Sequence, residues 1–352
     1  MIAYLIFIIA IVLLLSVDYA CKQDKYGLGT LLAVFVAITF TVLRFETGYD
    51  YLNYVGFING PVSELVDSNL EWGFVAVASV LKVFDIDYFW LFFLFGLAII
   101  LLLFRGIKLY TENVRIAFLI FLLIPGLFLN SFSIIRQSLA MVLLFNGYYY
   151  FFNQRYRYFW LFIILAVLFH YSALLALPFF WMATKLEKQA RLILLIGIPI
   201  SLVLAQMNVI EIVFGLILGS SKFGAYLDYE DSGTSLVKLI VLNVSVIPYL
   251  FFYKRFDTLN RSILILVIFG LMLINVFSSV AAITRIGYYF KIFEIVLLAN
   301  VVSFFKRGWS QVIFCILLFI YYFTMFYTSL SFDYNEVIDY PKLTPYKTIF
   351  ER

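Results

Sequence analysis

The chain has 352 residues, of which 64% are hydrophobic and 13% are charged, and its formal net charge is +4. A soluble globular domain carries about 25% charged residues, so this composition excludes that class. Long unbroken apolar runs predict an all-α polytopic integral membrane protein, because a membrane strand alternates polar and apolar residues and spans in about ten. No nucleic-acid partner is expected.

Short polar connections divide the chain into about twelve predicted transmembrane helices. The predicted spans are 1–17, 27–43, 88–104, 115–131, 137–152, 157–170, 171–184, 191–206, 236–253, 262–280, 286–304 and 309–328. The first run lacks a basic start and a small-residue cleavage site, which indicates a retained helix rather than a signal peptide. Residues 71–83 are too short to span comfortably and predict an interfacial or re-entrant helix. Residues 157–184 could form one long tilted helix, but basic pairs at both ends favour two short helices that meet at His170.

The distribution of basic residues predicts how the chain is oriented. Fifteen of the 25 Lys and Arg residues lie in every second short connection. These connections lie near residues 18–26, 105–115, 153–158, 185–191, 254–261 and 305–308. Short connections rich in Lys and Arg stay in the cytoplasm, so both ends of the chain are predicted to lie outside.

The sequence predicts a single integral membrane domain over residues 1–352. External loops are expected at 44–87 and 207–235, and neither is large enough for a separate domain. The external tail 329–352 is interpreted as an ordered lid, with a frayed terminus as the alternative. The two cysteines are separated by the predicted membrane, so no disulfide and no metal site are expected.

The string RFETGYDYLNY follows the second predicted helix and begins at Arg44. Within it, Gly48 permits a tight turn and Asp50 offers a carboxylate. Tyr51 and Tyr54 offer flat rings with hydroxyl groups, as sugar-binding sites use. The alternative is that the arginine snorkels at a helix end and the tyrosines belong to the membrane interface.

Three predicted helix starts at the external face carry the other candidate residues. Arg136 opens one of them, His170 opens the second with Ser172 as a predicted cap, and Arg285 opens the third with Thr284 as its cap. A helix start repels an arginine unless an anion lies there, and the arginine fork binds phosphate oxygens in pairs. The three arginines are therefore predicted to converge on a pyrophosphate. For each arginine alone, a lipid headgroup contact or an internal ion pair is the alternative.

His170 is the only histidine and has no second histidine or cysteine to share a metal with. It is predicted to act as a general base or to orient a hydroxyl group, with a packing role as the alternative. Asp50 is the rival base, and Glu46 and Glu71 rank behind it.

Together these strings resemble the EpsG-type branch of the Wzy polysaccharide polymerases. The resemblance is carried by the Arg-x(3)-Gly-x-Asp-Tyr-x(2)-Tyr string at Arg44, the Arg-Gln-x(2)-Ala string at Arg136, the His-x-Ser pair at His170 and the Arg-x(2)-Tyr string at Arg285. It covers nearly the whole chain in order and spacing.

The resemblance implies a GT-C-like membrane glycosyltransferase that joins oligosaccharide repeat units carried on undecaprenyl pyrophosphate. It also implies the outer face of the bacterial inner membrane, no metal or nucleotide-sugar cofactor, and a chain-length regulator protein as partner. The implied roles are pyrophosphate binding by Arg44, Arg136 and Arg285, proton removal by His170 or Asp50, and sugar packing by Tyr51, Tyr54 and Tyr289.

Two other activities fit the same composition. An O-antigen ligase would use the same donor, but a larger external loop than 207–235 would be expected. A flippase for lipid-linked oligosaccharides should bury charges along a path near the membrane midplane. The central portions of the predicted spans are read as almost free of ionisable groups, which favours chemistry at the surface over transport. A purely structural membrane protein would tolerate lysine in place of Arg136 and Arg285.

Overall fold

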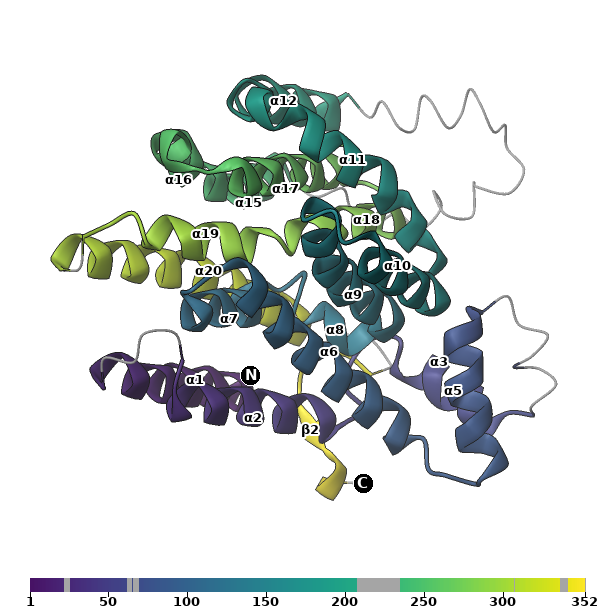
Figure 1. Cartoon of the computed structure of the whole chain (residues 1–352). Coiled ribbons are helices and arrows are strands. Elements are labelled where there is room, and N and C mark those ends of the chain that lie inside the picture. The colour runs from purple at the N-terminus through teal and green to yellow at the C-terminus, as the bar shows by residue number, and fades with distance from the viewer. Residues whose placement is uncertain are drawn as a thin grey trace. The chain divides into compact units, whose positions relative to one another are not determined.

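The computed structural model describes residues 1–21, 26–61, 65, 70–207, 235–306, 308–335 and 341–351. This described part of the chain is helical except for one two-stranded sheet and its connections (Figure 1). It divides into two compact units, which are described separately below. Unit 1 comprises Met1–Leu174 and Phe305–Arg352, and unit 2 comprises Leu175–Phe304. The predicted external loop 207–235 lies outside the described residues except at its two ends.

Unit 1 contains most of the candidate residues. Its helices are α1 (Ile2–Ala20), α2 (Leu28–Val42), α3 (Tyr51–Asn59), α5 (Trp72–Val83), α6 (Phe89–Tyr110), α7 (Val114–Leu123), α8 (Asn130–Ser133), α9 (Ile135–Phe152), α10 (Tyr156–Phe169) and α20 (Trp309–Asn335). Strand β1 (Arg44–Phe45) pairs antiparallel with β2 (Lys347–Thr348), and the 3-10 helix η5 (Ile349–Glu351) follows. The hairpin of α1 and α2 is visible side by side in Figure 1.

Unit 2 consists of α-helices joined by short 3-10 turns. Its elements are α11 (Ala176–Leu186), η2 (Glu187–Gln189), α12 (Ala190–Gln206), α15 (Leu236–Asn243), η3 (Val244–Val246), α16 (Ile247–Phe252), η4 (Tyr253–Arg255), α17 (Thr258–Val276), α18 (Ala281–Lys291) and α19 (Glu294–Val302). The 3-10 helix η1 (Tyr171–Leu175) leads into it from unit 1.

The predicted all-α membrane architecture is confirmed. Within the described part of the chain, six helical stretches are long and apolar enough to cross a membrane: Ile2–Ala20, Phe89–Tyr110, Tyr171–Gln206, Leu236–Arg255, Thr258–Val276 and Trp309–Asn335. Four shorter apolar helices accompany them, namely α2, α5, α7 and α10. The count of twelve spans stays a prediction.

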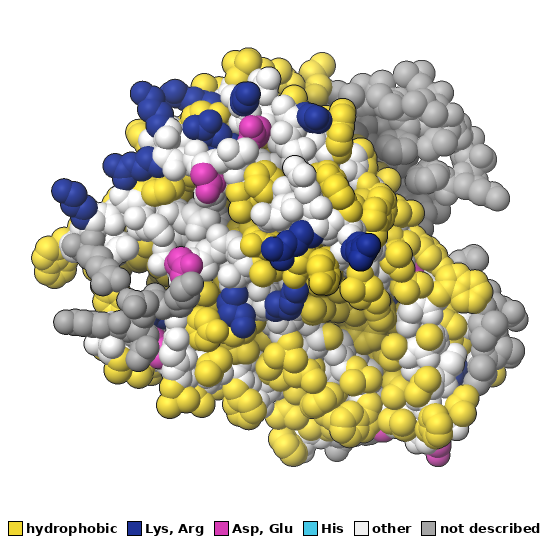
Figure 2. Space-filling view, in the orientation of Figure 1, with side chains coloured by type: hydrophobic (Ala, Val, Ile, Leu, Met, Phe, Trp, Pro, Cys, Tyr) yellow, Lys and Arg dark blue, Asp and Glu magenta, His cyan; other side chains and the backbone are white. Residues whose placement is uncertain are grey.

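Exposed apolar side chains follow the helical repeat, as lipid-facing helices require. On α1 the side chains of Ile2, Ile6, Ile9 and Leu13 are all more than half exposed. Figure 2 shows hydrophobic side chains over much of the visible face. In water such a surface would be costly, whereas in a bilayer it meets acyl chains of the same polarity.

One predicted span ends early for a local reason. The span 115–131 is helical only as far as Leu123, where α7 ends. Ile124 is extended because Pro125 disfavours the helical conformation of the residue before it. A turn and the short α8 complete the segment.

The prediction of a helix break within 157–184 is confirmed. α10 ends at Phe169, and His170 adopts an extended conformation with φ −160° and ψ 113°. Ser172 is not a helix cap, because it lies inside η1 and α11 begins after Leu175.

The predicted helix start at Arg285 is wrong by about one turn. α18 begins at Ala281, so Arg285 lies beyond its first turn. The hydroxyl group of Thr284 donates back to the carbonyl oxygens of Phe277 and Val280 and therefore does not cap the helix. The helix-start argument for an anion no longer applies to Arg285, because the free N–H groups precede it.

In unit 1, the candidate residues lie near the start of α6 and the basic connections lie near its end. Near the start of α6, the ring of Phe92 lies 5.2 Å from the guanidinium carbon of Arg44. Near its end, the Nζ atom of Lys108 lies 5.5 Å from the ring centre of Tyr26, in the connection of α1 and α2. A helix of 22 residues is about 33 Å long, so the two groups occupy opposite ends of unit 1. The assignment of these ends to the two membrane faces stays a prediction.

The predicted span 286–304 contains a buried ion pair that was not predicted from the sequence. Lys291 ends α18, Glu294 begins α19, and the two side chains form an ion pair with side-chain exposures of 2% and 0%. Lysine suits the end of a helix and glutamate suits a start, because each charge opposes the helix dipole there. The central portion of this predicted span, expected to be almost free of ionisable groups, therefore holds two of them. Because the two charges neutralise each other, the pair does not by itself make a charged path.

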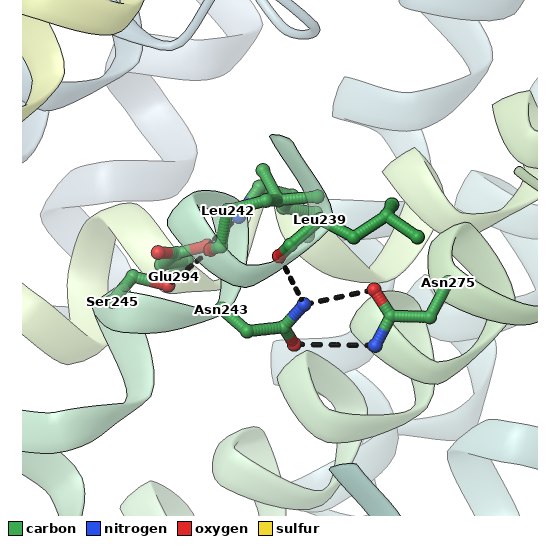
Figure 3. Close-up of polar contacts among 7 residues, drawn as sticks. Leu239, Leu242, Asn243, Ser245, Asn275 and Glu294 are labelled. Atoms are coloured by element: carbon green, nitrogen blue, oxygen red, sulfur yellow. Dashed lines mark hydrogen bonds and ion pairs between the residues drawn. The ribbon is translucent and has the colours of Figure 1, made fainter. Parts of the chain in front are cut away.

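A polar cluster joins three helices inside unit 2, and Figure 3 shows its two asparagine side chains. The side-chain amides of Asn243 on α15 and Asn275 on α17 exchange hydrogen bonds of 2.8 and 3.3 Å. Asn275 also donates to the hydroxyl oxygen of Ser201 on α12, at 2.8 Å. All three residues are buried, so their bonds are protected from competing water.

Replacing Asn275 with leucine is expected to lower the free energy of unfolding by about 1–3 kcal/mol, because Asn243 loses its amide donor inside the unit. Thermal unfolding of the purified protein in detergent measures the change. Gln206→Leu, at an exposed position of α12, is the matched control. Equal unfolding midpoints for the two variants would show that the cluster adds nothing to stability.

Candidate catalytic site around Glu71, Arg136 and His170

The loop after β1 is fixed against the segment that precedes α9. Gly48 has a φ of +114°, and a Cβ atom there would lie 2.3 Å from the carbonyl oxygen of Phe132. Only glycine fits this approach. The backbone N–H of Tyr49 then donates to the hydroxyl oxygen of Ser133 at 3.0 Å. The first and second sequence motifs therefore meet in space.

α5 lies close against the end of α10. A Cβ atom on Gly73 would lie 2.6 Å from the carbonyl oxygen of Leu168, so glycine permits the close approach of the two helices. Glu71 directly precedes α5, and His170 directly follows α10. This packing brings the carboxylate of Glu71 to the imidazole of His170. The helix predicted over 71–83 is thus present, and its role is to place Glu71.

The carboxylate of Glu71 bridges the two most prominent candidate residues. Its Oε1 atom lies 2.7 Å from Nδ1 of His170, and its Oε2 atom forms an ion pair with Nη1 of Arg136. The Glu71 side chain is only 6% exposed, whereas those of His170 and Arg136 are 26% and 21% exposed. Both outer partners are therefore partly accessible from the surface while the carboxylate is covered.

Aromatic rings hold Arg136 from the side of α3 and α5. Its guanidinium carbon lies 5.3 Å from the ring centre of Phe74 and 5.9 Å from that of Tyr54. Such cation–π contacts attract a guanidinium group and fix its plane. The alternative interpretation of Arg136 as a member of an internal ion pair is therefore correct in this structure, although partial exposure leaves the group within reach of an anion.

The electrostatics keep Glu71 ionised. Burial opposes its ionisation, but the hydrogen bond with His170 and the charge of Arg136 outweigh burial and lower the pKa of Glu71 below its usual value. A carboxylate accepts hydrogen bonds, so Nδ1 of a neutral His170 carries the proton and Nε2 keeps its lone pair. That tautomer can accept a proton from a hydroxyl group at Nε2.

Arg44 is placed differently from Arg136. It is 1% exposed, its Nη1 atom donates to the carbonyl oxygen of Thr41 at 2.7 Å, and the rings of Phe92 and Phe132 lie over it. Its Nε and Nη2 atoms have no hydrogen-bond partner among the described residues. Burial lowers the pKa of Arg44 to about 10, which leaves the group charged at neutral pH. Pyrophosphate contact by this enclosed group stays a prediction.

Residues 341–351, here called the C-terminal strap, lie over this end of unit 1. Thr348 pairs with Arg44 in the sheet, and the N–H of Gly48 donates to the carbonyl oxygen of Lys342 at 3.2 Å. The buried carboxylate of Asp333 accepts bonds from the backbone N–H groups of Leu343 and Thr344 and from the Thr344 hydroxyl group. The strap contacts the loop that carries Gly48, and the role of the tail as a lid stays a prediction.

Replacing Asp333 with alanine is expected to free the strap, because three buried donors lose their acceptor at about 1–3 kcal/mol each. Amide hydrogen exchange at Leu343 and Thr344 should become at least about tenfold faster. Asp87→Ala is the control, since the carboxylate of Asp87 bonds the N–H of Phe89, away from the strap. Unchanged exchange in the Asp333 variant would contradict the anchoring role.

The predicted sugar-binding tyrosines are all buried. Tyr51 is 2% exposed and its ring stacks on Phe92, with the ring centres 4.4 Å apart. Tyr54 and Tyr289 are 3% and 0% exposed. Their sugar-binding role stays a prediction, and in this structure the rings pack against protein. Asp50, the rival base, precedes α3 in a half-buried position and does not cap the helix with its side chain.

Arg285 lies on α18 in unit 2 and is exposed. The structure brings Arg136 and His170 together within unit 1 and places Arg44 beneath the strap of the same unit. Convergence of Arg285 with these residues stays a prediction. Among the described residues, no group of three or more His, Cys, Asp and Glu side chains is placed to hold a metal ion.

Among the candidate carboxylates, Glu71 has a more central place in the structure than its sequence context predicted. Asp50 came first because it lies in a recognisable string, whereas Glu71 precedes a helix too short to span the membrane. A partial signal did exist: a partly buried arginine requires a nearby carboxylate, and Glu71 is one of the acidic residues at the predicted outer face. Only the packing of α5 on α10 identifies which one.

Comparison with models of protein families identifies the family of this chain. The model of the EpsG family matches residues 28–348, which is nearly the whole chain and includes every candidate residue. The chain belongs to the EpsG family. This membership indicates a polysaccharide-polymerase-like role in a membrane. The EpsG-family chain matches none of the curated proteins and none of the solved structures.

Proposed function

We propose that this EpsG-family protein is a polysaccharide polymerase that joins oligosaccharide repeat units carried on undecaprenyl pyrophosphate. The reaction takes place at the outer face of the bacterial inner membrane and uses no metal or nucleotide sugar. Membership of the family supports the reaction class. The contact of His170 and Arg136 with one buried carboxylate is the observation that supports the site.

In the proposed reaction, a hydroxyl group of the acceptor unit attacks the anomeric carbon of the donor sugar. The bond from that carbon to the pyrophosphate oxygen breaks, and the lipid pyrophosphate leaves with the electron pair. Nε2 of His170 takes the proton of the hydroxyl group, with Asp50 as the rival base. Arg136 binds the leaving pyrophosphate and stabilises its developing charge, and Arg44 and Arg285 are the further candidates for this role.

The arrangement suits this chemistry because it supplies a base and a cation next to each other. Its base is oriented by a carboxylate that burial and two partners hold in place. Its cation is an arginine, whose planar fork matches two phosphate oxygens. Both lie at the end of unit 1 opposite the Lys108 connection, which is the arrangement that an external site requires.

Reconstitution tests the proposal directly. The purified protein is placed in lipid vesicles with a purified lipid-linked repeat unit and no nucleotide sugar, and chain length is followed by gel electrophoresis. Growth of the glycan by whole repeat units supports the polymerase. Transport of the unit across the vesicle membrane without elongation would favour the flippase, and transfer only to an added lipid A-type acceptor would favour the ligase. A requirement for a length-regulating partner would appear as uncontrolled chain lengths in the same assay.

A further inference from the structure

The two oxygen atoms of the Glu71 carboxylate serve different partners. Oε1 contacts the imidazole of His170, and Oε2 contacts the guanidinium group of Arg136. These are the groups to which the proposed function gives the proton and the pyrophosphate. Glu71 is thus the direct structural link between them, and it is covered where they are partly exposed.

A buried carboxylate divides its negative charge between its partners. A strong contact with the Arg136 cation draws electron density towards Oε2 and weakens the hold of Oε1 on the proton at Nδ1 of His170. A pyrophosphate bound to Arg136 would compete for the same cation, because a guanidinium group shares its charge among its anionic partners. The attraction between Arg136 and Glu71 would then weaken, and the carboxylate would polarise His170 more strongly.

The aromatic support of Arg136 permits this exchange of partners. The ring centres of Phe74 and Tyr54 lie 5.3 and 5.9 Å from the guanidinium carbon of Arg136 and hold the group by cation–π attraction. One edge atom, Nη1, is used by Glu71, and Nε is buried without a hydrogen-bond partner among the residues that the structure describes, so an anion would approach through the rest of the side chain, which is 21% exposed. Arg136 can therefore take on phosphate oxygens without leaving its rings.

We propose that Glu71 is a positioning residue that links pyrophosphate binding at Arg136 to activation of His170. Without donor, Glu71 holds both groups in place and its charge is shared. When donor is bound, the pyrophosphate interacts with Arg136 and weakens the ion pair between Arg136 and Glu71. The Glu71 carboxylate then interacts more strongly with His170, whose Nε2 becomes the stronger base. The base is thereby activated when a leaving group is present. This inference rests on the proposed function.

The variant Glu71→Gln keeps the shape of the side chain and removes its charge. It is expected to lower kcat about 10²-fold, because the base loses its anionic partner. The KM for the lipid-linked donor should stay the same or fall, because Arg136 is released from its carboxylate. Glu71→Asp keeps the charge on a shorter side chain and should restore part of kcat. Glu112→Gln, an exposed carboxylate in the connection before α7, is the matched control and should behave as wild type.

A purely structural role for Glu71 predicts a different outcome. A loosened α5 would reduce the amount of folded protein or raise KM, and the aspartate variant would give no rescue of kcat. A wild-type kcat in Glu71→Gln overturns the inference. If Glu71→Gln does not accumulate in the membrane, Glu71→Asp decides, because an unchanged kcat in that variant overturns the inference as well.

A second measurement separates this inference from the polymerase assignment. His170 is the only histidine, so isotope-labelled histidine in a protein purified without a histidine tag reports on this imidazole alone. Inorganic pyrophosphate should shift its ring-nitrogen resonances in the wild-type protein and leave them unchanged in Glu71→Gln. A wild-type response in a protein that makes no polymer would refute the polymerase and keep the link. Polymer synthesis with no response to pyrophosphate would refute the link and keep the polymerase.

Discussion

Replacing His170 with alanine is expected to slow glycan elongation by about 10²–10⁴-fold, the usual effect of removing a general base. Donor binding should change little, because Arg136 and Glu71 keep their ion pair. Single-turnover measurements with a lipid-linked repeat unit give the rate of transfer, and retention of labelled donor on the purified protein gives binding.

The companion variant for this experiment is Asp50→Asn. A wild-type rate in His170→Ala together with a large loss in Asp50→Asn would move the role of base to Asp50. Loss of donor binding in His170→Ala would instead show that the imidazole supports the anion site. Both variants should accumulate in the membrane, since neither residue is fully buried.

Replacing Arg136 with lysine is expected to stop the formation of long chains and leave single repeat units on the lipid carrier. The lysine ammonium group cannot reproduce the paired contacts of the guanidinium group with phosphate, and it also changes the cation–π contacts with Phe74 and Tyr54. A loss of about 10²–10³-fold in kcat/KM is expected for one charge-stabilising group. Chain length on gels and donor titration measure it.

Arg157→Lys is the matched control for this substitution, because Arg157 is exposed at the start of α10, at the opposite end of unit 1. It should support normal polymer. Normal long chains from Arg136→Lys would exclude Arg136 from pyrophosphate binding and leave it the structural role of partner to Glu71.

The helices could be read from the sequence because apolar runs and polar breaks are local signals. The break at His170 followed from basic residues on both sides of a 28-residue apolar stretch, and the structure places it there. Helix ends were less certain, because they depend on single residues. Pro125 ends α7 early, and the hydroxyl group of Thr284 donates to the carbonyl oxygen of Phe277, earlier in the chain, instead of capping a helix.

The candidate site was predictable only in part. The arginines and the histidine stood out as rare ionisable groups beside apolar helices, and the strings that carry them matched a family. Their neighbours did not stand out. Glu71 reaches His170 across 99 residues of sequence, and the pairing depends on a glycine that lets two helices approach. The ion pair of Lys291 and Glu294 was missed because residues 286–304 were predicted as one span, whereas α18 ends at Lys291 and α19 begins at Glu294.

The pairing of β1 with β2 has a consequence for how the protein is made. β1 follows the hairpin of α1 and α2, whereas its partner strand β2 is translated after every α-helix of the described chain. The early helices are therefore inserted long before β2 is translated and can pair with β1 beside the Gly48 loop. A chain that stalls before residue 341 carries the arginine and histidine groups but lacks the strand that pairs with Arg44, so premature termination yields helices without a completed candidate site.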